Sequence, residues 1–278
     1  MRGTALVTML LAAMGPAAAM APMKGMAPMK GMSPMKGMAP MGAMPRMGAP
    51  ADVAAGVAAP GRPKTARDLD EVRKPVEVLR FMGLKKGDRV LDYFTGSGYY
   101  AEIMAKAVGP KGLVLGWNSS GFMNDKTKAA LDGIRKRDPN FGYFATPATA
   151  LAFPKEGFDF ALLHLVYHDT YWESAEYKVP RIDPNKVVEA LWYSLKPGGT
   201  VAVIDHVATP GGDTREVVEK MHRIDPAKVR ADFERGGFVL EAQSDLLRVP
   251  SDDHSKNVFD PSIRGKTDRF MFRFRKPG

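Results

Sequence analysis

Short apolar runs alternate with longer amphipathic stretches over most of the chain, and this pattern predicts the elements of the fold. Runs rich in Val, Leu, Ile and Phe predict strands at residues 90–91, 113–117, 141–146, 158–165 and 200–205. Helical spacing or a cap residue before proline predicts helices at residues 67–84, 99–107, 125–136, 184–196 and 226–235, with a break at Pro75. Residues 238–242 and 269–274 predict a final antiparallel pair. Strands that alternate with helices in this way are typical of an α/β domain with a mostly parallel sheet.

A glycine-containing turn follows the first predicted strand and gives the clearest signal for a binding site. Asp92 ends the strand, and Gly96 and Gly98 lie just before the helix predicted from residue 99. Glycines at such a turn let the backbone approach a ligand, and the unpaired amides of the first helical turn can donate to it. The turn therefore predicts a ligand site, although plain β-turn-α connections have the same pattern.

The motifs around this turn resemble those of the class I S-adenosylmethionine-dependent methyltransferases. The resemblance rests on Val-Leu-Asp-x-x-x-Gly-x-Gly at residues 90–98 and on Leu-Lys-Pro-Gly-Gly before a Val/Ile strand at residues 195–204. More narrowly, the chain is similar to a family of exported bacterial predicted methyltransferases. The motifs shared with that family are Gly-Tyr-Tyr at 98–100, Val-Tyr-His-Asp at 166–169, His-Arg-Ile-Asp-Pro at 222–226 and Asn-Val-Phe-Asp-Pro-Ser-Ile-Arg-Gly-Lys-Thr-Asp at 257–268. The resemblance covers residues 66–278 and implies a Rossmann-like, doubly wound fold, with a mostly parallel seven-stranded sheet and an antiparallel last strand.

The resemblance also implies which residues meet the methyl donor. S-adenosylmethionine would be bound by Asp92, Phe94, Gly96, Ser97, Gly98 and Asn118. Phe94 departs from the usual pattern because it takes the place of the first of three glycines. Asn118 replaces the acidic residue that usually holds the ribose hydroxyls, so we expect an uncharged contact in which its amide accepts one hydrogen bond and donates another. No acidic residue precedes residues 151–153, where one often meets the adenine.

Polar residues at the carboxyl ends of two later strands are the candidates for catalysis. Ligands of open parallel sheets bind at this edge, so His168, Asp169 and His206 should face the methyl acceptor. His168 and His206 could meet there, with Asp169 or Asp205 orienting one of them as a general base. A metal held by two imidazoles and a carboxylate is a competing chemistry, and hydrogen-bonded structural histidines are the third interpretation. No histidine pair has i, i+4 spacing in a predicted helix, so we predict no metal site.

A long polar segment separates the last two predicted strands. Residues 243–268 far exceed the about 2 to 5 residues of an ordinary hairpin loop. Its charged and polar residues are Asp252, Asp253, His254, Asn257, Asp260, Arg264, Lys266 and Asp268. We expect this segment to be functional, either as a lid or as part of the substrate wall.

The first 64 residues lack the pattern of a folded core. Residues 1–19 are typical of a cleaved export signal; a membrane anchor is less favoured because Gly15 and Pro16 interrupt the apolar run. Residues 20–64 form a Met/Pro/Gly/Ala-rich repeat and linker, with methionine at every third position from Met20 to Met47. Because thioethers favour Cu(I), the repeat is either a copper-binding tail or a low-complexity spacer. The methyltransferase-like domain is expected at residues 65–278, in the periplasm or secreted.

Composition narrows the classes of function. The net charge of +9 is concentrated in residues 1–64, where seven basic residues face one acidic residue, so no nucleic-acid partner is expected. Cysteine is absent, which excludes disulfides, thiolate metal sites and cysteine nucleophiles. We expect methyl transfer to a small-molecule acceptor outside the cytoplasm, with no stable membrane insertion after signal cleavage. The alternative is a non-catalytic exported binding protein with a Cu(I)-binding tail, because S-adenosylmethionine is made in the cytoplasm.

Overall fold

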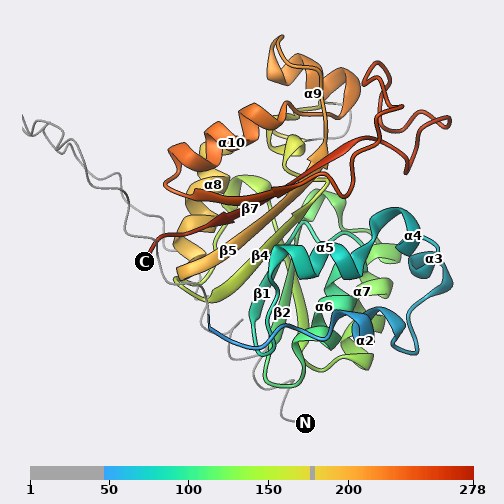
Figure 1. Cartoon of the computed structure of the whole chain (residues 1–278), viewed down its shortest axis with the longest axis vertical. Coiled ribbons are helices and arrows are strands. Elements are labelled where there is room, and N and C mark those ends of the chain that lie inside the picture. Colours follow the sequence, from blue (N-terminus) through green and yellow to red (C-terminus); the bar gives the residue numbers. More distant parts are fainter. Residues whose placement is uncertain (1–46, 176–178) are drawn as a thin grey trace, which may run out of the picture.

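One seven-stranded sheet forms the centre of the protein (Figure 1). The computed structural model describes residues 47–175 and 179–278. The strand order is β3-β2-β1-β4-β5-β7-β6, in which β1 to β5 are parallel and β7 lies antiparallel between β5 and β6. The strands are β1 (Arg89–Tyr93), β2 (Leu113–Ser119), β3 (Phe141–Thr146), β4 (Phe158–His164), β5 (Leu195–His206), β6 (Val239–Ser244) and β7 (Arg269–Arg275). The predicted Rossmann-like sheet with an antiparallel last strand is confirmed.

Helices cover both faces of the sheet, as a doubly wound fold requires (Figure 1). They are α2 (Val53–Ala58), α3 (Lys64–Arg67), α4 (Asp70–Arg73), α5 (Pro75–Met82), α6 (Tyr99–Val108), α7 (Asp125–Arg137), α8 (Pro184–Ser194), α9 (Thr214–Met221) and α10 (Pro226–Arg235), with the short 3-10 turns η1 (Ser120–Phe122), η2 (Ala148–Ala150) and η3 (His168–Tyr171). The helices α2, α5, α6 and α7 pack on one face, and α8 and α10 pack on the other. Asp183 and Asp225 cap α8 and α10 ahead of a proline, as their sequences predict.

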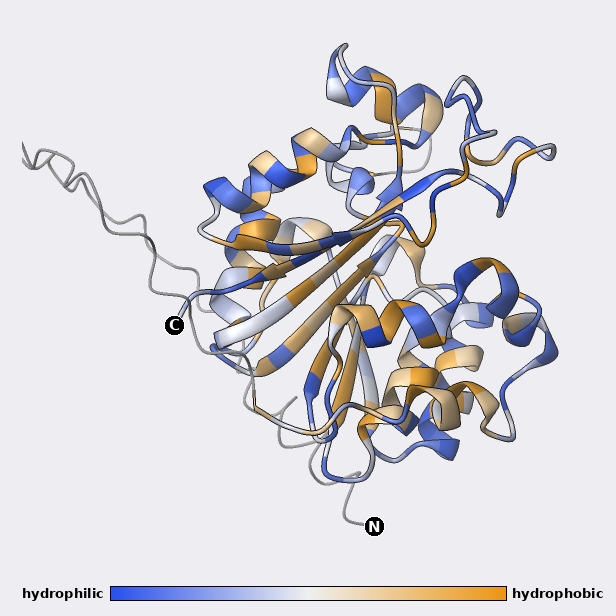
Figure 2. Ribbon diagram, in the orientation of Figure 1, coloured by the Kyte–Doolittle hydropathy of each residue, from blue (hydrophilic) through white to orange (hydrophobic). Residues whose placement is uncertain are grey.

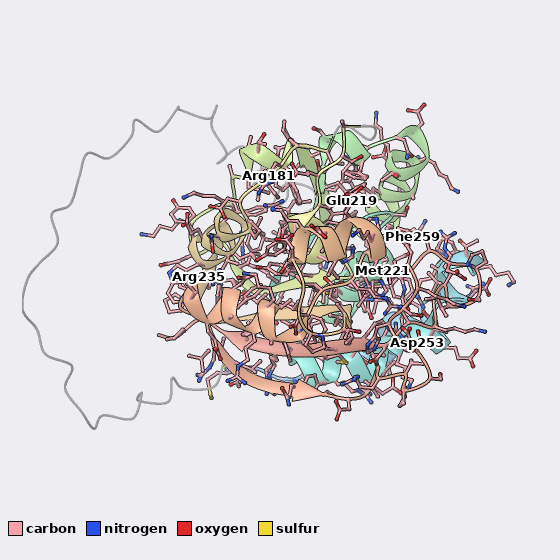
Figure 3. The ribbon with its side chains drawn as sticks, turned by 90° about the horizontal axis from the view of Figure 1, so that it is seen from above. Arg181, Glu219, Met221, Arg235, Asp253 and Phe259 are labelled. Atoms are coloured by element: carbon pink, nitrogen blue, oxygen red, sulfur yellow. The ribbon has the colours of Figure 1, made fainter. Side chains whose placement is uncertain are left out.

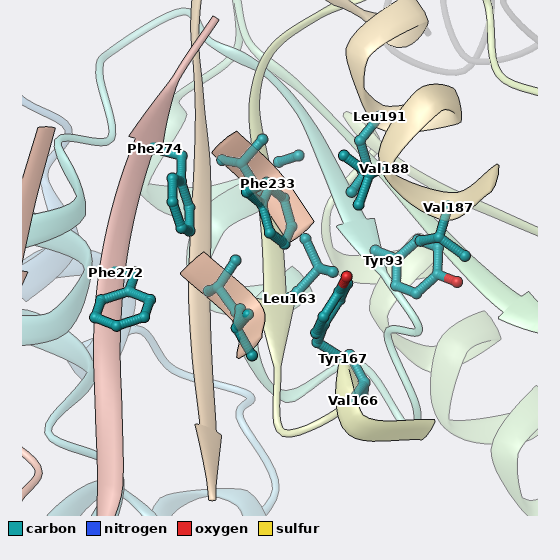
Figure 4. Close-up of a cluster of buried hydrophobic side chains, with 14 of the residues drawn as sticks. Tyr93, Leu163, Val166, Tyr167, Val187, Val188, Leu191, Phe233, Phe272 and Phe274 are labelled. Atoms are coloured by element: carbon teal, nitrogen blue, oxygen red, sulfur yellow. The ribbon is translucent and has the colours of Figure 1, made fainter. Parts of the chain in front are cut away.

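The central strands are buried on both faces, which explains their continuous apolar sequences. Figure 2 shows the hydrophobic residues concentrated in the sheet and on the inner sides of the helices. Successive residues of β1 point to opposite cores, so Val90 packs against α5 and α6 whereas Leu91 faces the α8 side. Figure 4 shows the core on the α8 side, where the rings of Phe233 and Phe274 stack with their centroids 4.6 Å apart.

The folded domain begins before residue 65, so the boundary predicted from the sequence is wrong. The residues expected to form a linker include α2, which Asp52 caps. The backbone N–H of Asp52 donates to the carbonyl of Ala107 at 3.1 Å, and Val53 is buried. A Cβ atom added at Gly56 would lie 2.7 Å from the carbonyl oxygen of Ile103, so α2 and α6 are in backbone contact. Small residues, which look like linker in the sequence, are what this close packing needs.

The predicted export signal and nearly all of the methionine repeat lie outside the described residues. Within the part of the chain that the structure describes, none of the helices has the length and apolar character needed to cross a membrane.

Three segments lie beyond the carboxyl ends of the parallel strands and surround the site. They are η3 after β4, α9 after β5, and residues 245–268 between β6 and β7 (Figure 1). The helix α9 is absent from the sequence prediction. The backbone N–H of Val258 donates to the carbonyl of Met221 at 3.2 Å, so residues 245–268 pack against the end of α9. Figure 3 shows Met221 and Phe259 close together at this end of the molecule.

Candidate active site

A cavity of about 230 Å³ opens at the carboxyl ends of β1, β2 and β4. Its walls are mainly aromatic and apolar: Tyr93, Phe94, Trp117, Phe122, Pro147, Ala148, Val166, Trp172, Val179, Pro180 and Ile182, with Ser119, Ser120, Gly121, Asp169 and Thr170. Asp169 is the only carboxylate among the described wall residues. An apolar cavity with few polar groups at this edge of an α/β sheet is the expected form of a ligand site.

Phe94 forms part of the cavity wall. Its backbone has φ +58°, a left-handed conformation that costs about 1–2 kcal/mol for a residue with a side chain and that glycine adopts freely. The ring lies 5.9 Å from that of Trp117 and 5.2 Å from that of Phe122, both in edge-to-face contact. The ring of Phe94 therefore forms part of the cavity wall, while its backbone has a left-handed conformation that glycine adopts easily.

The glycine turn itself is held by Asn118 at the end of β2. The side-chain oxygen of Asn118 accepts from the backbone N–H of Gly96 at 2.9 Å, and its amide nitrogen donates to the carbonyl of Gly96 at 3.1 Å. A Cβ atom at Gly98 would lie 2.3 Å from the side chain of Ile134, so Gly98 allows α7 to pack on the turn. The predicted cofactor-binding residues Gly96, Ser97, Gly98 and Asn118 do not line the cavity, and the side chain of Asn118 is engaged by the backbone of Gly96.

Asp92 also lies outside the cavity wall. Because side chains alternate along β1, Tyr93 faces the cavity and Asp92 faces the opposite core. The hydroxyl of Thr95 donates to the Asp92 carboxyl at 2.6 Å. Burial raises the pKa of Asp92 to about 7, although this hydrogen bond lowers it. Asp92 therefore supports the turn from within the protein.

A polar cluster formed by His168, Asp169 and His222 adjoins the cavity through Asp169; we call it the His168 cluster. His168 begins η3, and its Nδ1 lies 2.7 Å from a carboxylate oxygen of Asp205 at the end of β5. The Asp205 carboxylate also accepts the backbone N–H of His168 at 2.9 Å. The other ring nitrogen, Nε2, consequently faces Asp169 Oδ1 at 3.2 Å, and His222 Nδ1 lies 3.8 Å from the same oxygen.

The charges of this cluster support one another. Burial opposes the charged form of His168, but the carboxylates of Asp205 and Asp169 raise its pKa well above the usual value. Burial likewise opposes ionisation of Asp169, yet the neighbouring charge of His168 holds the pKa of Asp169 below its usual range. Without another cation present, His168 is an imidazolium between two carboxylates.

Comparisons with known proteins agree with this architecture. The family model described as protein-L-isoaspartate(D-aspartate) O-methyltransferase matches residues 72–140, which include β1, the glycine turn and β2. Demethylmenaquinone methyltransferase of Listeria welshimeri is 28% identical over 130 residues, covering 46% of this chain and 49% of that protein. The 2-phytyl-1,4-naphtoquinone methyltransferase of Synechococcus elongatus is 33% identical over 133 residues, with the same coverage. The chain thus spans about half the length of these relatives.

Solved structures extend the likeness to most of the chain. A SAM-dependent methyltransferase from Aquifex aeolicus has a TM-score of 0.52 at 21% identity, covering 75% of this chain and 98% of that one. An S-adenosylmethionine-dependent methyltransferase from Mesorhizobium loti has a TM-score of 0.51 at 18% identity, covering 74% and 99%. The chain therefore has the fold of the S-adenosylmethionine-dependent methyltransferases and is similar to members of that class in sequence over about half of its length.

The wall of the cavity has features that suit the adenosine part of S-adenosylmethionine. Flat aromatic walls from Phe94 and Trp117 suit a base, and the hydroxyls of Ser119 and Ser120 are the polar groups next to the end of β2. A Cβ atom at Gly96 would meet nothing within 4 Å, which leaves open space above the turn. The carboxylate that usually holds the ribose is missing, because Asn118 stands in its place and binds Gly96.

His206 occupies a different place from the other residues that the sequence predicts to be catalytic. Its ring lies 5.9 Å from that of His168, so the two histidines approach each other as the sequence predicts. However, its Nδ1 pairs with the hydroxyl of Thr267 at 2.7 Å, and burial lowers its pKa to about 3. His206 is therefore a neutral residue that does not line the cavity.

His222 is the member of the cluster that sequence reasoning missed. It ends α9 with φ +49° and donates its backbone N–H to the carbonyl of Val218 at 2.9 Å. The motif His-Arg-Ile-Asp-Pro includes this residue, but the sequence prediction lacks α9 and therefore does not place His222 beside Asp169. The signal that could have found it is Asp213, an N-cap residue ahead of apolar positions at helical spacing.

Proposed function

We propose that the protein transfers a methyl group from S-adenosylmethionine to a small acceptor that carries a hydroxyl group on an apolar or aromatic body. The observation that supports this proposal most directly is the aromatic cavity at the carboxyl edge of the sheet, whose wall includes Asp169 of the His168 cluster. The relatives named for demethylmenaquinone and for 2-phytyl-1,4-naphtoquinone support the apolar, aromatic body of this acceptor. The near-neutral charge of the chain after residue 64 supports a small molecule over a nucleic acid.

In this proposal the aromatic part of the cavity binds the donor, and the part next to Asp169 binds the acceptor. The rings of Phe94 and Trp117 exclude water around the base of the donor, and the ring of Tyr93 attracts its cationic sulfonium centre. Asp169, kept ionised by the neighbouring charge of His168, accepts a hydrogen bond from the hydroxyl of the acceptor and directs the acceptor oxygen at the methyl carbon, in line with the departing sulfur. Catalysis then depends mainly on positioning, and fixed side chains provide it.

We further propose that the protein acts in the periplasm or after secretion. The predicted export signal at residues 1–19 supports this location. Methyl transfer there requires a donor supplied from the cytoplasm. If no donor binds, the alternative is a non-catalytic exported binding protein, with Cu(I) on the methionine repeat.

Calorimetric titration of the full chain with S-adenosylmethionine tests the proposal. Phe122→Ala removes a wall ring that is 41% exposed, so the variant should fold normally and bind the donor about tenfold more weakly, because stacking on one aromatic ring contributes about 1–3 kcal/mol. Tyr193→Ala, at a ring outside this cavity that is 52% exposed, is the matched control and should bind as the wild type does. Absence of binding at millimolar donor would refute the methyltransferase proposal.

A further inference from the structure

We propose that His168, Asp169 and His222 together bind one divalent transition-metal ion at the edge of the methyl-donor cavity. Each of the three side chains offers one ligand atom, and these atoms lie within 4.8 Å of one another. A metal bound at about 2.0–2.1 Å in tetrahedral geometry separates its ligand atoms by about 3.3 Å. Nε2 of His168 and Nδ1 of His222 lie 3.2 Å and 3.8 Å from Asp169 Oδ1, which is already close to that value.

The surroundings of His168 are those of a metal-binding imidazole. Asp205 has no exposed surface, and its carboxylate lies 2.7 Å from His168 Nδ1 while it accepts the backbone N–H groups of His168 and His206. A carboxylate on one ring nitrogen fixes the tautomer and directs the other nitrogen to a metal. Nε2 of His168 is the nitrogen left for the metal, and it points toward Asp169.

The third ligand is held in place by the backbone and by packing. His222 takes a left-handed conformation, φ +49°, which costs about 1–2 kcal/mol and therefore requires support from its neighbours. The guanidinium of Arg223, the next residue, has no exposed surface and makes two hydrogen bonds to Asp252 at 2.9 Å and 3.0 Å. The ring of His222 packs against those of Trp172 and Phe259, with centroids 5.1 Å and 4.9 Å away. The ligand is thus fixed before any metal arrives.

The donor set identifies the class of metal. Two imidazoles and one carboxylate suit Zn²⁺, Fe²⁺ or Co²⁺, and three protein ligands leave at least one coordination position for a substrate. That position is next to the cavity, because Asp169 lines it. Thioethers of the methionine repeat select Cu(I) instead, so the two kinds of site differ in the metal they would bind.

This inference rests on the proposed function for its chemical role. The acceptor oxygen would bind the open position and release its proton to solvent, and the oxygen would then form a bond to the methyl carbon. The carbon–sulfur bond breaks, its electron pair stays on sulfur, and S-adenosylhomocysteine leaves. The metal lowers the pKa of the hydroxyl and is unchanged by the reaction.

Cobalt binding to the untagged full chain tests the site, with metal-free protein prepared by chelation. We expect one Co²⁺ per chain, with the visible absorption of a nitrogen- and oxygen-coordinated ion. His222→Gln should weaken this binding at least 100-fold, and Asp205→Asn should weaken it about 10- to 100-fold by releasing the ring of His168. His254→Gln is the matched control, since His254 pairs with Asp268 outside the cluster, and it should bind as the wild type does.

Two results would overturn the proposal: no Co²⁺ binding by the wild type, or equal binding by His222→Gln and His254→Gln. Titration of the metal-free protein with S-adenosylmethionine tests the proposed function independently of the metal site. If the wild type binds S-adenosylmethionine but no Co²⁺, only the metal site is refuted. If it binds Co²⁺ but no S-adenosylmethionine, the methyl-transfer role is refuted and the metal site is supported.

Discussion

Asp92 is a buried carboxyl group directly before the glycine turn, and it makes the pH dependence of stability a test of the turn's geometry. The residue is 4% exposed, and the hydroxyl of Thr95 donates to it at 2.6 Å. Burial raises the pKa of Asp92 from 3.8 to about 7, whereas the hydrogen bond from Thr95 lowers it. The folded protein therefore holds a proton that the unfolded chain has already released.

The sign and size of the effect follow from this difference. Between pH 4 and pH 7 the folded state binds one more proton than the unfolded state, so the free energy of unfolding falls by about 1.4 kcal/mol per pH unit. A shift of about three pKa units gives a total loss of about 4 kcal/mol by pH 8. The contribution is fully present below pH 4 and is lost as the pH rises through about 7.

Replacing the carboxyl by an amide should remove this dependence. Asp92→Asn keeps the hydrogen bond from Thr95 but loses one acceptor, which costs about 1 kcal/mol at every pH. We therefore expect the variant to match the wild type within about 1 kcal/mol at pH 5 and to be about 3 kcal/mol more stable at pH 8. Urea denaturation followed by tryptophan fluorescence measures both values, and the exposed Asp125→Asn is the control. Parallel pH curves for wild type and Asp92→Asn would refute the reasoning.

Three further predictions test other parts of the structure. Gly56→Ala should lower the free energy of unfolding by about 1–3 kcal/mol in thermal denaturation, because its Cβ would lie 2.7 Å from a backbone oxygen, whereas Gly121→Ala, where the Cβ meets nothing within 4 Å, should be neutral. Asp252→Asn should cost about 3–5 kcal/mol and speed proteolysis of residues 245–268, because Arg223 is buried, while the exposed Asp253→Asn should do neither. Asn118→Asp should weaken donor binding about tenfold by calorimetry, because a carboxylate repels the carbonyl of Gly96; tighter binding would contradict this.

The sheet could be predicted almost completely from the sequence, because strands buried on both faces need continuous apolar runs. The break at Pro75 and the caps at Asp183 and Asp225 follow from local backbone chemistry, and the structure has them. The helix α2 could not be recognised, since its alanines and glycine stabilise the fold only through contact with α6, which the local sequence does not reveal. The strand β5 begins at Leu195, earlier than predicted, because Lys-Pro-Gly-Gly extends the sheet by pairing with β4 and the end of β7.

The site was predictable only where it depends on topology. His168 and Asp169 follow a parallel strand, so their place at the ligand edge follows from the fold class. The direction of the Asn118 side chain depends on how closely β2 approaches the turn. The spacing of residues in the sequence does not give that distance. His222 reaches the cluster through the left-handed end of a helix, so a prediction of its role required α9 and its orientation first.

The segment between β6 and β7 supports the residues next to His222, whereas its sequence predicts a lid or part of the substrate wall. None of its residues lines the cavity. The guanidinium of Arg223 binds Asp252 and donates to the carbonyl of Lys256 at 3.0 Å, and Val258 donates to the carbonyl of Met221. These bonds hold the residues on both sides of His222, whose left-handed backbone is costly unless its neighbours are fixed. Asp252 and the carbonyl of Lys256 therefore act through Arg223 to hold the imidazole of His222 beside Asp169.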